Sequence, residues 1–109
     1  MNGKSYSNGF ILESPGTIEK YYLKINVDNK FSKLEFDLGH VDGEPGYDDG
    51  TFAFYIDNKY ITTITKSPKD LITHEVVELN YGELLRIEYD TGWPGYFDAY
   101  GFGNVVLVP

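Results

Sequence analysis

Apolar and polar side chains alternate along much of this chain. The clearest case is residues 34–38, where Leu34, Phe36 and Leu38 alternate with two carboxylates. A period of two predicts a β-strand that buries one face and exposes the other. Eight segments with strand-like patterns follow one another along the sequence: residues 9–13, 21–27, 34–38, 52–56, 60–65, 77–79, 85–89 and 102–108.

Residues that favour tight turns separate these segments. Asp57 and Asn58 both tolerate the positive φ that a two-residue hairpin demands, so we expect a hairpin there. Further turn signals lie at residues 14–16, 28–29, 67–68, 81–82 and 93–95. Helical spacing with caps is missing; the best candidate, residues 67–73, offers at most one short turn. The chain is therefore predicted to be all-β.

Short strands joined by turns favour two antiparallel sheets packed face to face, because parallel strands would need helical crossovers. We predict a single antiparallel two-sheet β-sandwich of the jelly-roll type, with a closed barrel as the alternative. The 109 residues fit one domain, without repeats or linkers. Because the first residues are polar, we expect residues 1–109 to be one module excised from a larger protein.

The charge distribution narrows the range of partners. Nine Lys and Arg against seventeen Asp and Glu give a net charge of −8, and neither Lys nor Arg occurs in residues 34–58 or 87–109. Such a chain repels nucleic acid and anionic lipid. No apolar run approaches the ~20 residues of a bilayer span. We therefore expect no nucleic-acid partner and no membrane insertion. The absence of cysteine excludes disulfides, thiolate zinc sites and cysteine nucleophiles.

The acidic, glycine-rich loop at residues 39–50, GHVDGEPGYDDG, is a candidate calcium site. Hard cations take roughly six to eight oxygen ligands, which a flexible acidic loop can supply from carboxylates and carbonyls. The candidate ligands are Asp42, Asp48 and Asp49. The alternative is a solvated loop in which Asp and Gly only form turns and no cofactor is required.

Aromatic side chains gather in residues 91–104, TGWPGYFDAYGFGN, where glycine and proline disfavour regular structure. Sugars are bound by flat aromatic rings beside carboxylates and amides, because they expose apolar C–H faces ringed by hydroxyls. The candidate ligand-binding residues are Trp93, Tyr96, Tyr100, Asp90 and Asp98, with Asn104 as a further polar partner and Tyr47 from the acidic loop. Alternatively, these rings fill the core of the sandwich, and Tyr100 points inward.

Catalytic constellations are weak in this sequence. His40 and His74 lack the spacing of a zinc site, and we expect a plain turn residue and a half-exposed strand residue, respectively. No serine has a GxSxG context. Paired carboxylates for glycoside cleavage would need a larger cleft than a chain of this size usually builds. We therefore expect that the chain is not an enzyme.

Four short motifs follow one another along the chain: the turn Asn29-Lys30-Phe31, the strand end Leu38-Gly39 with Asp42, the hairpin FYIDNK at residues 54–59, and the sequence of Leu79, Gly82 and Leu85-Arg86-Ile87. Their order, from about Tyr6 to Val108, resembles the NPCBM-like family, carbohydrate-binding modules of bacterial glycosidases and surface proteins. Asn58 stands where that family usually has glycine, and residues 43–46 are inserted before the acidic doublet.

The resemblance implies a galactose-binding-domain-like jelly roll without catalytic activity. It also implies an extracellular or cell-surface location on an exported protein, and a glycan or polysaccharide as the ligand. We expect a monomer within a multidomain protein. The alternative function is a structural or adhesive spacer of a bacterial surface protein, which binds no glycan and buries its aromatic side chains.

Overall fold

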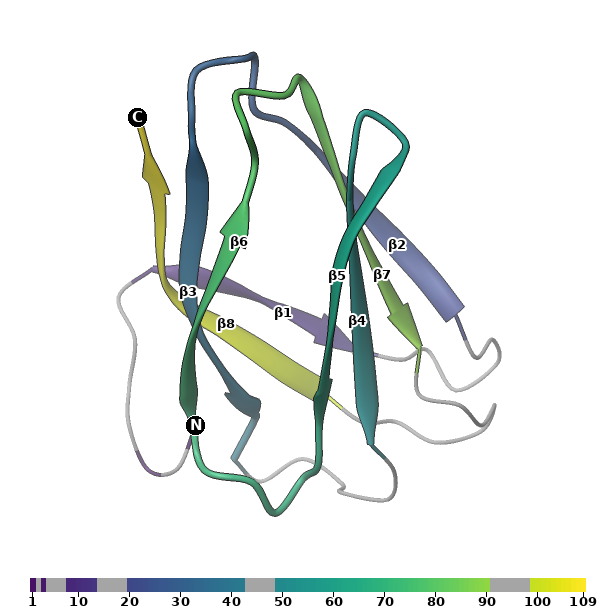
Figure 1. Cartoon of the computed structure of the whole chain (residues 1–109). Coiled ribbons are helices and arrows are strands. Elements are labelled where there is room, and N and C mark those ends of the chain that lie inside the picture. The colour runs from purple at the N-terminus through teal and green to yellow at the C-terminus, as the bar shows by residue number, and fades with distance from the viewer. Residues whose placement is uncertain (2, 4–7, 14–19, 43–48, 91–98) are drawn as a thin grey trace.

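The computed structural model describes residues 1, 3, 8–13, 20–42, 49–90 and 99–109, and these form eight strands (Figure 1). The strands are β1 (Gly9–Glu13), β2 (Lys20–Asn26), β3 (Lys33–His40), β4 (Gly50–Ile56), β5 (Lys59–Lys66), β6 (Thr73–Glu78), β7 (Leu84–Asp90) and β8 (Ala99–Val108). Each of the eight predicted segments corresponds to one strand, although the segments 21–27 and 77–79 end one residue beyond β2 and β6, so the all-β prediction is confirmed. Residues 67–73 contain a turn and no helix. The described residues contain no helix long and apolar enough for a membrane span.

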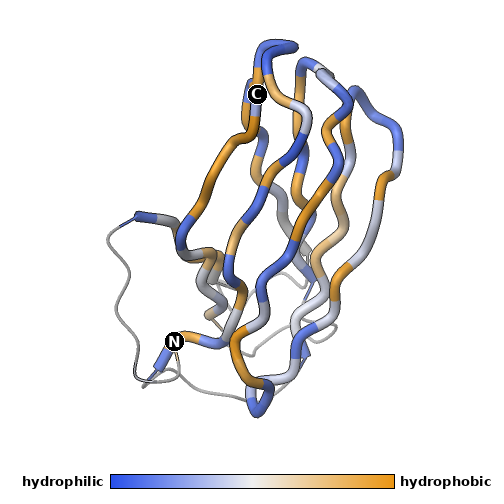
Figure 2. Tube along the Cα trace, turned by 60° about the vertical axis from the view of Figure 1, so that its left-hand side comes forward, coloured by the Kyte–Doolittle hydropathy of each residue, from blue (hydrophilic) through white to orange (hydrophobic). Residues whose placement is uncertain are grey.

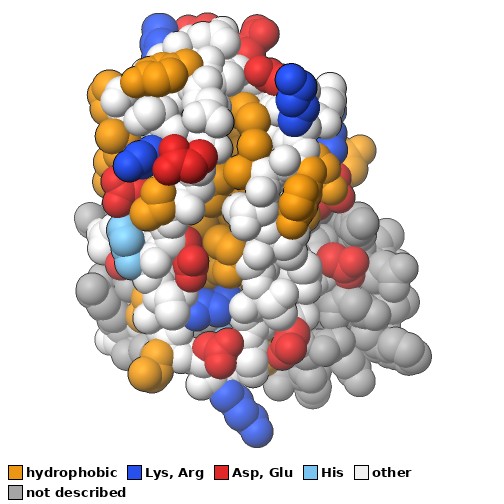
Figure 3. Space-filling model, viewed as in Figure 1, with side chains coloured by type: hydrophobic (Ala, Val, Ile, Leu, Met, Phe, Trp, Pro, Cys, Tyr) orange, Lys and Arg blue, Asp and Glu red, His pale blue; other side chains and the backbone are white. Residues whose placement is uncertain are grey.

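The strands form two four-stranded sheets, with the orders β1-β8-β3-β6 and β2-β7-β4-β5. Every pairing is antiparallel. The sheets lie face to face as two layers (Figure 1), so the predicted antiparallel sandwich is confirmed. The edge strands β5 and β6 lie beside each other across one side of the sandwich, and Figure 3 shows apolar side chains between them.

The core consists of the inward side chains of both sheets. Alternate residues of β3, β4 and β7 are buried, which explains the alternation of hydropathy along the chain in Figure 2. Aromatic rings fill the centre: Phe36 lies 4.7 Å from Phe102, and Phe52 stacks on Tyr89 at 5.0 Å between ring centroids. The period-two pattern therefore reflects one buried face per strand.

The predicted hairpin at Asp57 and Asn58 joins β4 to β5, with φ values of 50° and 65°. The turn predicted at residues 28–29 is also present, and both of its residues have positive φ, with values of 59° and 58°. The turn before β7 lies at Asn80 and Tyr81, one residue earlier than predicted. Asp and Asn occupy most of these positions because their side chains tolerate left-handed backbone.

The acidic loop is shorter than predicted, because β3 includes Gly39 and His40 and β4 begins at Gly50. A Cβ on Gly50 would lie 2.7 Å from Cε2 of Tyr100, so this glycine allows close approach to a buried ring. The expectation of a plain turn at His40 is wrong. Its ring meets that of Tyr100 edge-on, with centroids 5.2 Å apart.

Candidate functional site

The strand ends that flank the predicted ligand residues meet at one end of the sandwich. We call it the loop end: the end where β1, β3 and β7 stop and β2, β4 and β8 start. The register places Asp90 opposite both Lys20 and Thr51, and it places Tyr100 opposite His40. The strand ends that flank residues 14–19, 43–48 and 91–98 therefore all lie at this end. Strand pairing brings together the points from which these segments leave the fold.

Five of the predicted site residues lie outside the described residues: Tyr47, Asp48, Trp93, Tyr96 and Asp98. Their predicted roles stay predictions. Asp90 is described and half-buried, at the end of β7.

The prediction that Tyr100 binds a ligand is wrong. Its side chain is fully buried, and its hydroxyl donates a hydrogen bond to the carbonyl of Lys66 at 3.2 Å. The ring contacts Phe52 and Tyr89 edge-on, at 5.5 and 6.0 Å between centroids. Tyr100 is therefore part of the floor beneath the loop end and offers no ring face to a ligand. The alternative of an inward ring holds at this position.

Asn104 does not join the loop end either. It lies further along β8 and has a positive φ of 48°. Its side-chain amide donates a hydrogen bond to Oδ2 of Asp37 at 3.0 Å, on the outer face of the β1-β8-β3-β6 sheet. This contact gives Asn104 a place in a polar network of that sheet.

Two of the three predicted calcium ligands are described. The carboxylate of Asp42 accepts a hydrogen bond from the amide of Gly3 at 2.6 Å and lies 3.3 Å from the amine of Met1. Asp49 is exposed and directly precedes β4. Within the part of the chain that the structure describes, no three acidic or histidine side chains are placed to share a metal ion. The calcium site stays a prediction, because Asp48 lies outside that part.

A second candidate surface, which the sequence did not predict, is the outer face of the β2-β7-β4-β5 sheet. We call it the tyrosine face. A depression of about 280 Å³ on it is lined by Tyr22, Lys24, Arg86 and Glu88. The cross-strand register arranges its side chains in two rows: Tyr22, Glu88, Ala53 and Thr63 in one, and Lys24, Arg86, Tyr55 and Tyr60 in the other.

The guanidinium of Arg86 is held in a fixed position on this face. Its Nε donates a hydrogen bond to Oε2 of Glu88 at 3.1 Å, and its Nη1 donates to Oδ1 of Asn58 at 2.9 Å. Its Cζ lies 4.3 Å from the centroid of the Tyr55 ring, a cation–π distance. These three contacts restrict the rotation of the side chain, so the guanidinium of Arg86 is preorganised on this face.

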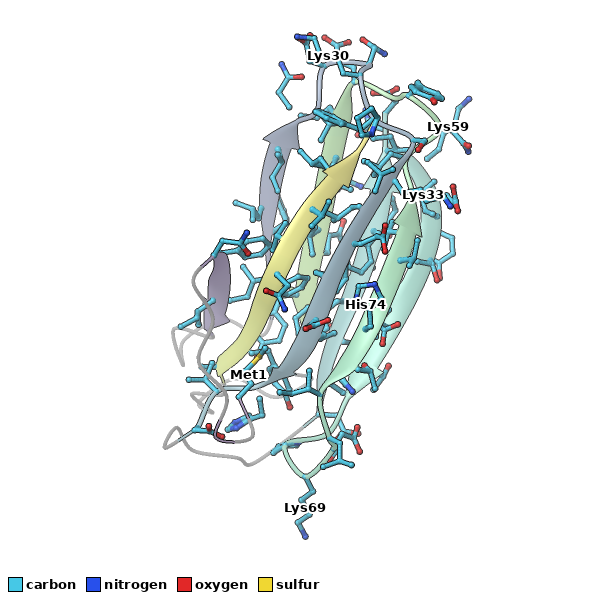
Figure 4. All side chains as sticks on the ribbon, turned by 90° about the vertical axis from the view of Figure 1, so that its left-hand side faces the viewer. Met1, Lys30, Lys33, Lys59, Lys69 and His74 are labelled. Atoms are coloured by element: carbon cyan, nitrogen blue, oxygen red, sulfur yellow. The ribbon has the colours of Figure 1, made fainter. Side chains whose placement is uncertain are left out.

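His74 lies on the outer face of the β1-β8-β3-β6 sheet and is labelled in Figure 4. Its Nδ1 lies 2.9 Å from Oδ1 of Asp37, and its Nε2 lies 3.0 Å from Oε1 of Glu35. These hydrogen bonds, first to Asp37 and then to Glu35, raise the pKa of His74 above 6.5. The expected half-exposed strand residue is confirmed, because His74 lies in β6 and its side chain is 55% exposed. His74 therefore links β6 to β3 through two side-chain hydrogen bonds.

No family model matches this chain, and no curated protein matches it. Solved structures do match. The structure of the M60 catalytic domain with CBM51-1 and CBM51-2 from Clostridium perfringens ZmpB superposes with a TM-score of 0.73 at 11% identity, over 94% of this chain and 10% of that one. The CBM51 of Clostridium perfringens GH95, in complex with methyl-galactose, gives 0.70 at 16% identity, over 96% of this chain and 72% of that one.

A third structure, CBM51-2 and INT domains of ZmpB in complex with GlcNAc, gives a TM-score of 0.68 at 14% identity. The alignment covers 94% of this chain and 23% of that one, so the chain spans a small part of the ZmpB structures. At these identities the likeness shows the fold. The predicted galactose-binding-domain-like sandwich is confirmed, whereas membership of the NPCBM-like family stays a prediction.

Proposed function

We propose that this chain is a non-catalytic carbohydrate-binding module that takes its glycan at the loop end. The fold supports this most strongly: nearly the whole chain superposes on CBM51 modules, two of them solved with methyl-galactose or GlcNAc. Connecting segments on a rigid sandwich commonly form binding sites. Here three such segments leave the same end, and one of them contains Trp93, Tyr96 and Asp98.

The chemistry of these segments favours an uncharged glycan. Residues 34–58 and 87–109 contain no Lys or Arg, so the segments with the predicted ligand residues supply carboxylates and aromatic rings instead. Carboxylates accept hydrogen bonds from sugar hydroxyls, and an indole packs on the apolar face of a pyranose. Trp93 is assigned the stacking role, and Asp90 and Asp98 the acceptor roles. We further propose an extracellular location on a larger protein.

A glycan array of wild type against Trp93→Ala tests the proposal. We expect wild-type binding to neutral glycans and at least a tenfold loss in the variant, corresponding to about 1.4 kcal/mol. The matched control is Tyr81→Asn, which removes a 54% exposed ring at the opposite end. Asn suits the positive φ of 56° at that position. An array without binding, or identical profiles for wild type and Trp93→Ala, would favour the spacer function.

Tryptophan fluorescence gives an independent measurement, because Trp93 is the only tryptophan in the chain. We expect red-shifted emission that acrylamide quenches readily, since a stacking surface must face solvent. Addition of a glycan found on the array should protect the indole from acrylamide. Blue-shifted emission that acrylamide does not quench in the free protein would show that the indole is buried, and it would contradict the role of Trp93 as a stacking surface for sugars.

A further inference from the structure

The tyrosine face has an exposed aromatic surface of its own, formed by described residues of β2, β4, β5 and β7. Tyr22 is 59% exposed, and its ring contacts the ammonium of Lys24, 5.7 Å from the centroid. Across the sheet, Tyr55 and Tyr60 form an edge-on pair with centroids 5.7 Å apart. In the row of Tyr22 and Glu88, the next residue across the sheet is Ala53, whose side chain is only a methyl group. The depression of about 280 Å³ is close to the lower limit of ligand pockets, about 300 Å³.

The charges on this face differ from those of the whole molecule. Lys24 lies directly opposite Arg86 in the β2–β7 register, on a chain whose net charge is −8. Like charges at directly opposite positions destabilise a sheet unless an anion lies between them. Glu88 lines the same depression, and it accepts a hydrogen bond from Nε of Arg86. Within the described residues, Lys24 has no carboxylate partner.

Arg86 retains unused hydrogen-bond donors. A guanidinium has five N–H groups, and the described contacts to Glu88 and Asn58 use two of them. Arg86 and Lys24 both line the depression, together with Tyr22. A single carboxylate can accept hydrogen bonds from both cations, and such charge-assisted bonds are among the stronger ones. A polyanion such as nucleic acid is disfavoured by the overall negative charge.

We propose that the tyrosine face is a second binding site, specific for a pyranose with a carboxylate, such as a hexuronic acid. The apolar face of the sugar packs on Tyr22, and its carboxylate accepts hydrogen bonds from Lys24 and Arg86. The choice of a saccharide rests on the function proposed above. The preference for an anion rests on the pairing of Lys24 with Arg86 alone.

The test is an NMR titration of the ¹⁵N-labelled chain with methyl β-D-glucuronide and methyl β-D-glucoside. These probes differ in the carboxylate that replaces the hydroxymethyl group. We expect the glucuronide to shift the amide signals of residues 22–24 and 86–88, with an affinity at least tenfold above that of the glucoside. Equal affinities for the two probes, or shifts confined to other residues, would overturn the proposal.

Two variants assign the contacts. Lys24→Met keeps the aliphatic stem and removes the charge, so the preference for the glucuronide should fall about tenfold, the effect of one charge-assisted hydrogen bond. Tyr22→Ala should weaken the binding of both glycosides, because it removes the ring on which the sugar packs. The matched control is Lys69→Met, which removes the same charge from an exposed lysine that points away from the sandwich in Figure 4. An equal loss in Lys69→Met would show a general charge effect and overturn the site.

The two proposals can fail separately. Glucuronide binding at β2 and β7 that persists in Trp93→Ala would support the tyrosine face, whatever the array shows for the loop end. Array binding that depends on Trp93, without glucuronide shifts at residues 22–24 and 86–88, would support the loop end and refute the second site.

Discussion

Gly50 shows how the role of a single residue depends on what lies across the core. In the sequence it ends a glycine-rich acidic stretch and predicts a flexible loop. In the structure it begins β4, and a Cβ there would lie 2.7 Å from Tyr100 and 3.1 Å from Tyr89. Both rings are fully buried and cannot move without disturbing their neighbours. Glycine is required here for space.

We therefore expect Gly50→Ala to lower the free energy of unfolding by about 1–3 kcal/mol, the usual cost of an added group in a packed core. Urea denaturation followed by far-UV circular dichroism measures this change. The control is Thr51→Ser on the outer face, which should stay within about 0.5 kcal/mol of wild type. A Gly50→Ala variant as stable as wild type would show that the rings of Tyr100 and Tyr89 can shift to make room for the methyl group.

His74 is a second single residue with a predicted effect on stability, and this effect depends on pH. Because its pKa is raised in the folded state, the contribution is fully present below the unfolded pKa of about 6.5. It is lost as the pH rises through the higher folded value. We expect His74→Gln to lower the Tm at pH 6 and to have a smaller effect at pH 9, measured by differential scanning fluorimetry.

An NMR titration of the imidazole checks the cause of this shift. The His74 signal should titrate above pH 6.5 in wild type and at a lower pH in Asp37→Asn, since Asp37 makes the largest contribution. A Tm difference between wild type and His74→Gln that does not change between pH 6 and pH 9 would contradict the assignment.

The sequence could not separate inward from outward tyrosines. Tyr100 and Tyr22 both lie in strands, where aromatic residues are favoured on either face. Tyr100 is fully buried and Tyr22 is 59% exposed. The difference arises because the strand of Tyr100 turns this ring toward the opposite sheet, whereas Tyr22 lies on the outer face. For the same reason the tyrosine face escaped prediction: Tyr22 and Arg86 come together through the pairing of β2 with β7, which local patterns do not reveal.

At the scale of elements, the strands were predictable and their order in the sheets was not. Each strand buries one face, so its existence shows in local hydropathy. The positions of β8 between β1 and β3, and of β7 between β2 and β4, join residues far apart in the chain. The hairpin between β4 and β5 was predictable because Asp57 and Asn58 favour that turn.

Asp57 also connects this hairpin to β7. Its carboxylate accepts hydrogen bonds from the amides of Leu84 and Glu83 at 3.0 to 3.2 Å. These bonds, with Leu84 first, lower the pKa of Asp57 below 3.8, so its contribution to stability is present above that pH. The contribution is lost as the pH falls through the lowered value.

We expect Asp57→Asn to lower the Tm at pH 7, and we expect this deficit to shrink under acid conditions below pH 3.8. Asn keeps the tolerance for positive φ, so the variant isolates the charge. Thermal melting across the acid range measures the effect. The contrary result is a deficit that stays constant with pH, which would mean that the carboxylate charge does not stabilise the turn.

At the scale of the whole molecule, the predicted calcium site would link two layers. Asp42 follows β3 in one sheet, and Asp48 and Asp49 precede β4 in the other. An ion that binds only the folded state raises its stability. If these three carboxylates bind calcium, millimolar calcium should raise the Tm of wild type and have a smaller effect on Asp49→Asn. An unchanged wild-type Tm would leave the acidic segment as a solvated turn.

The course of β7 places the two proposed sites in succession along one strand. Glu88 borders the depression of the tyrosine face, and Asp90, the next outward residue, ends the strand at the loop end. Two residues of extended chain span about 7 Å. An oligosaccharide that mixes neutral and acidic units could then occupy both surfaces at once, with the avidity of a bivalent ligand. Affinity would grow with the length and order of the polysaccharide and not only with the identity of one sugar.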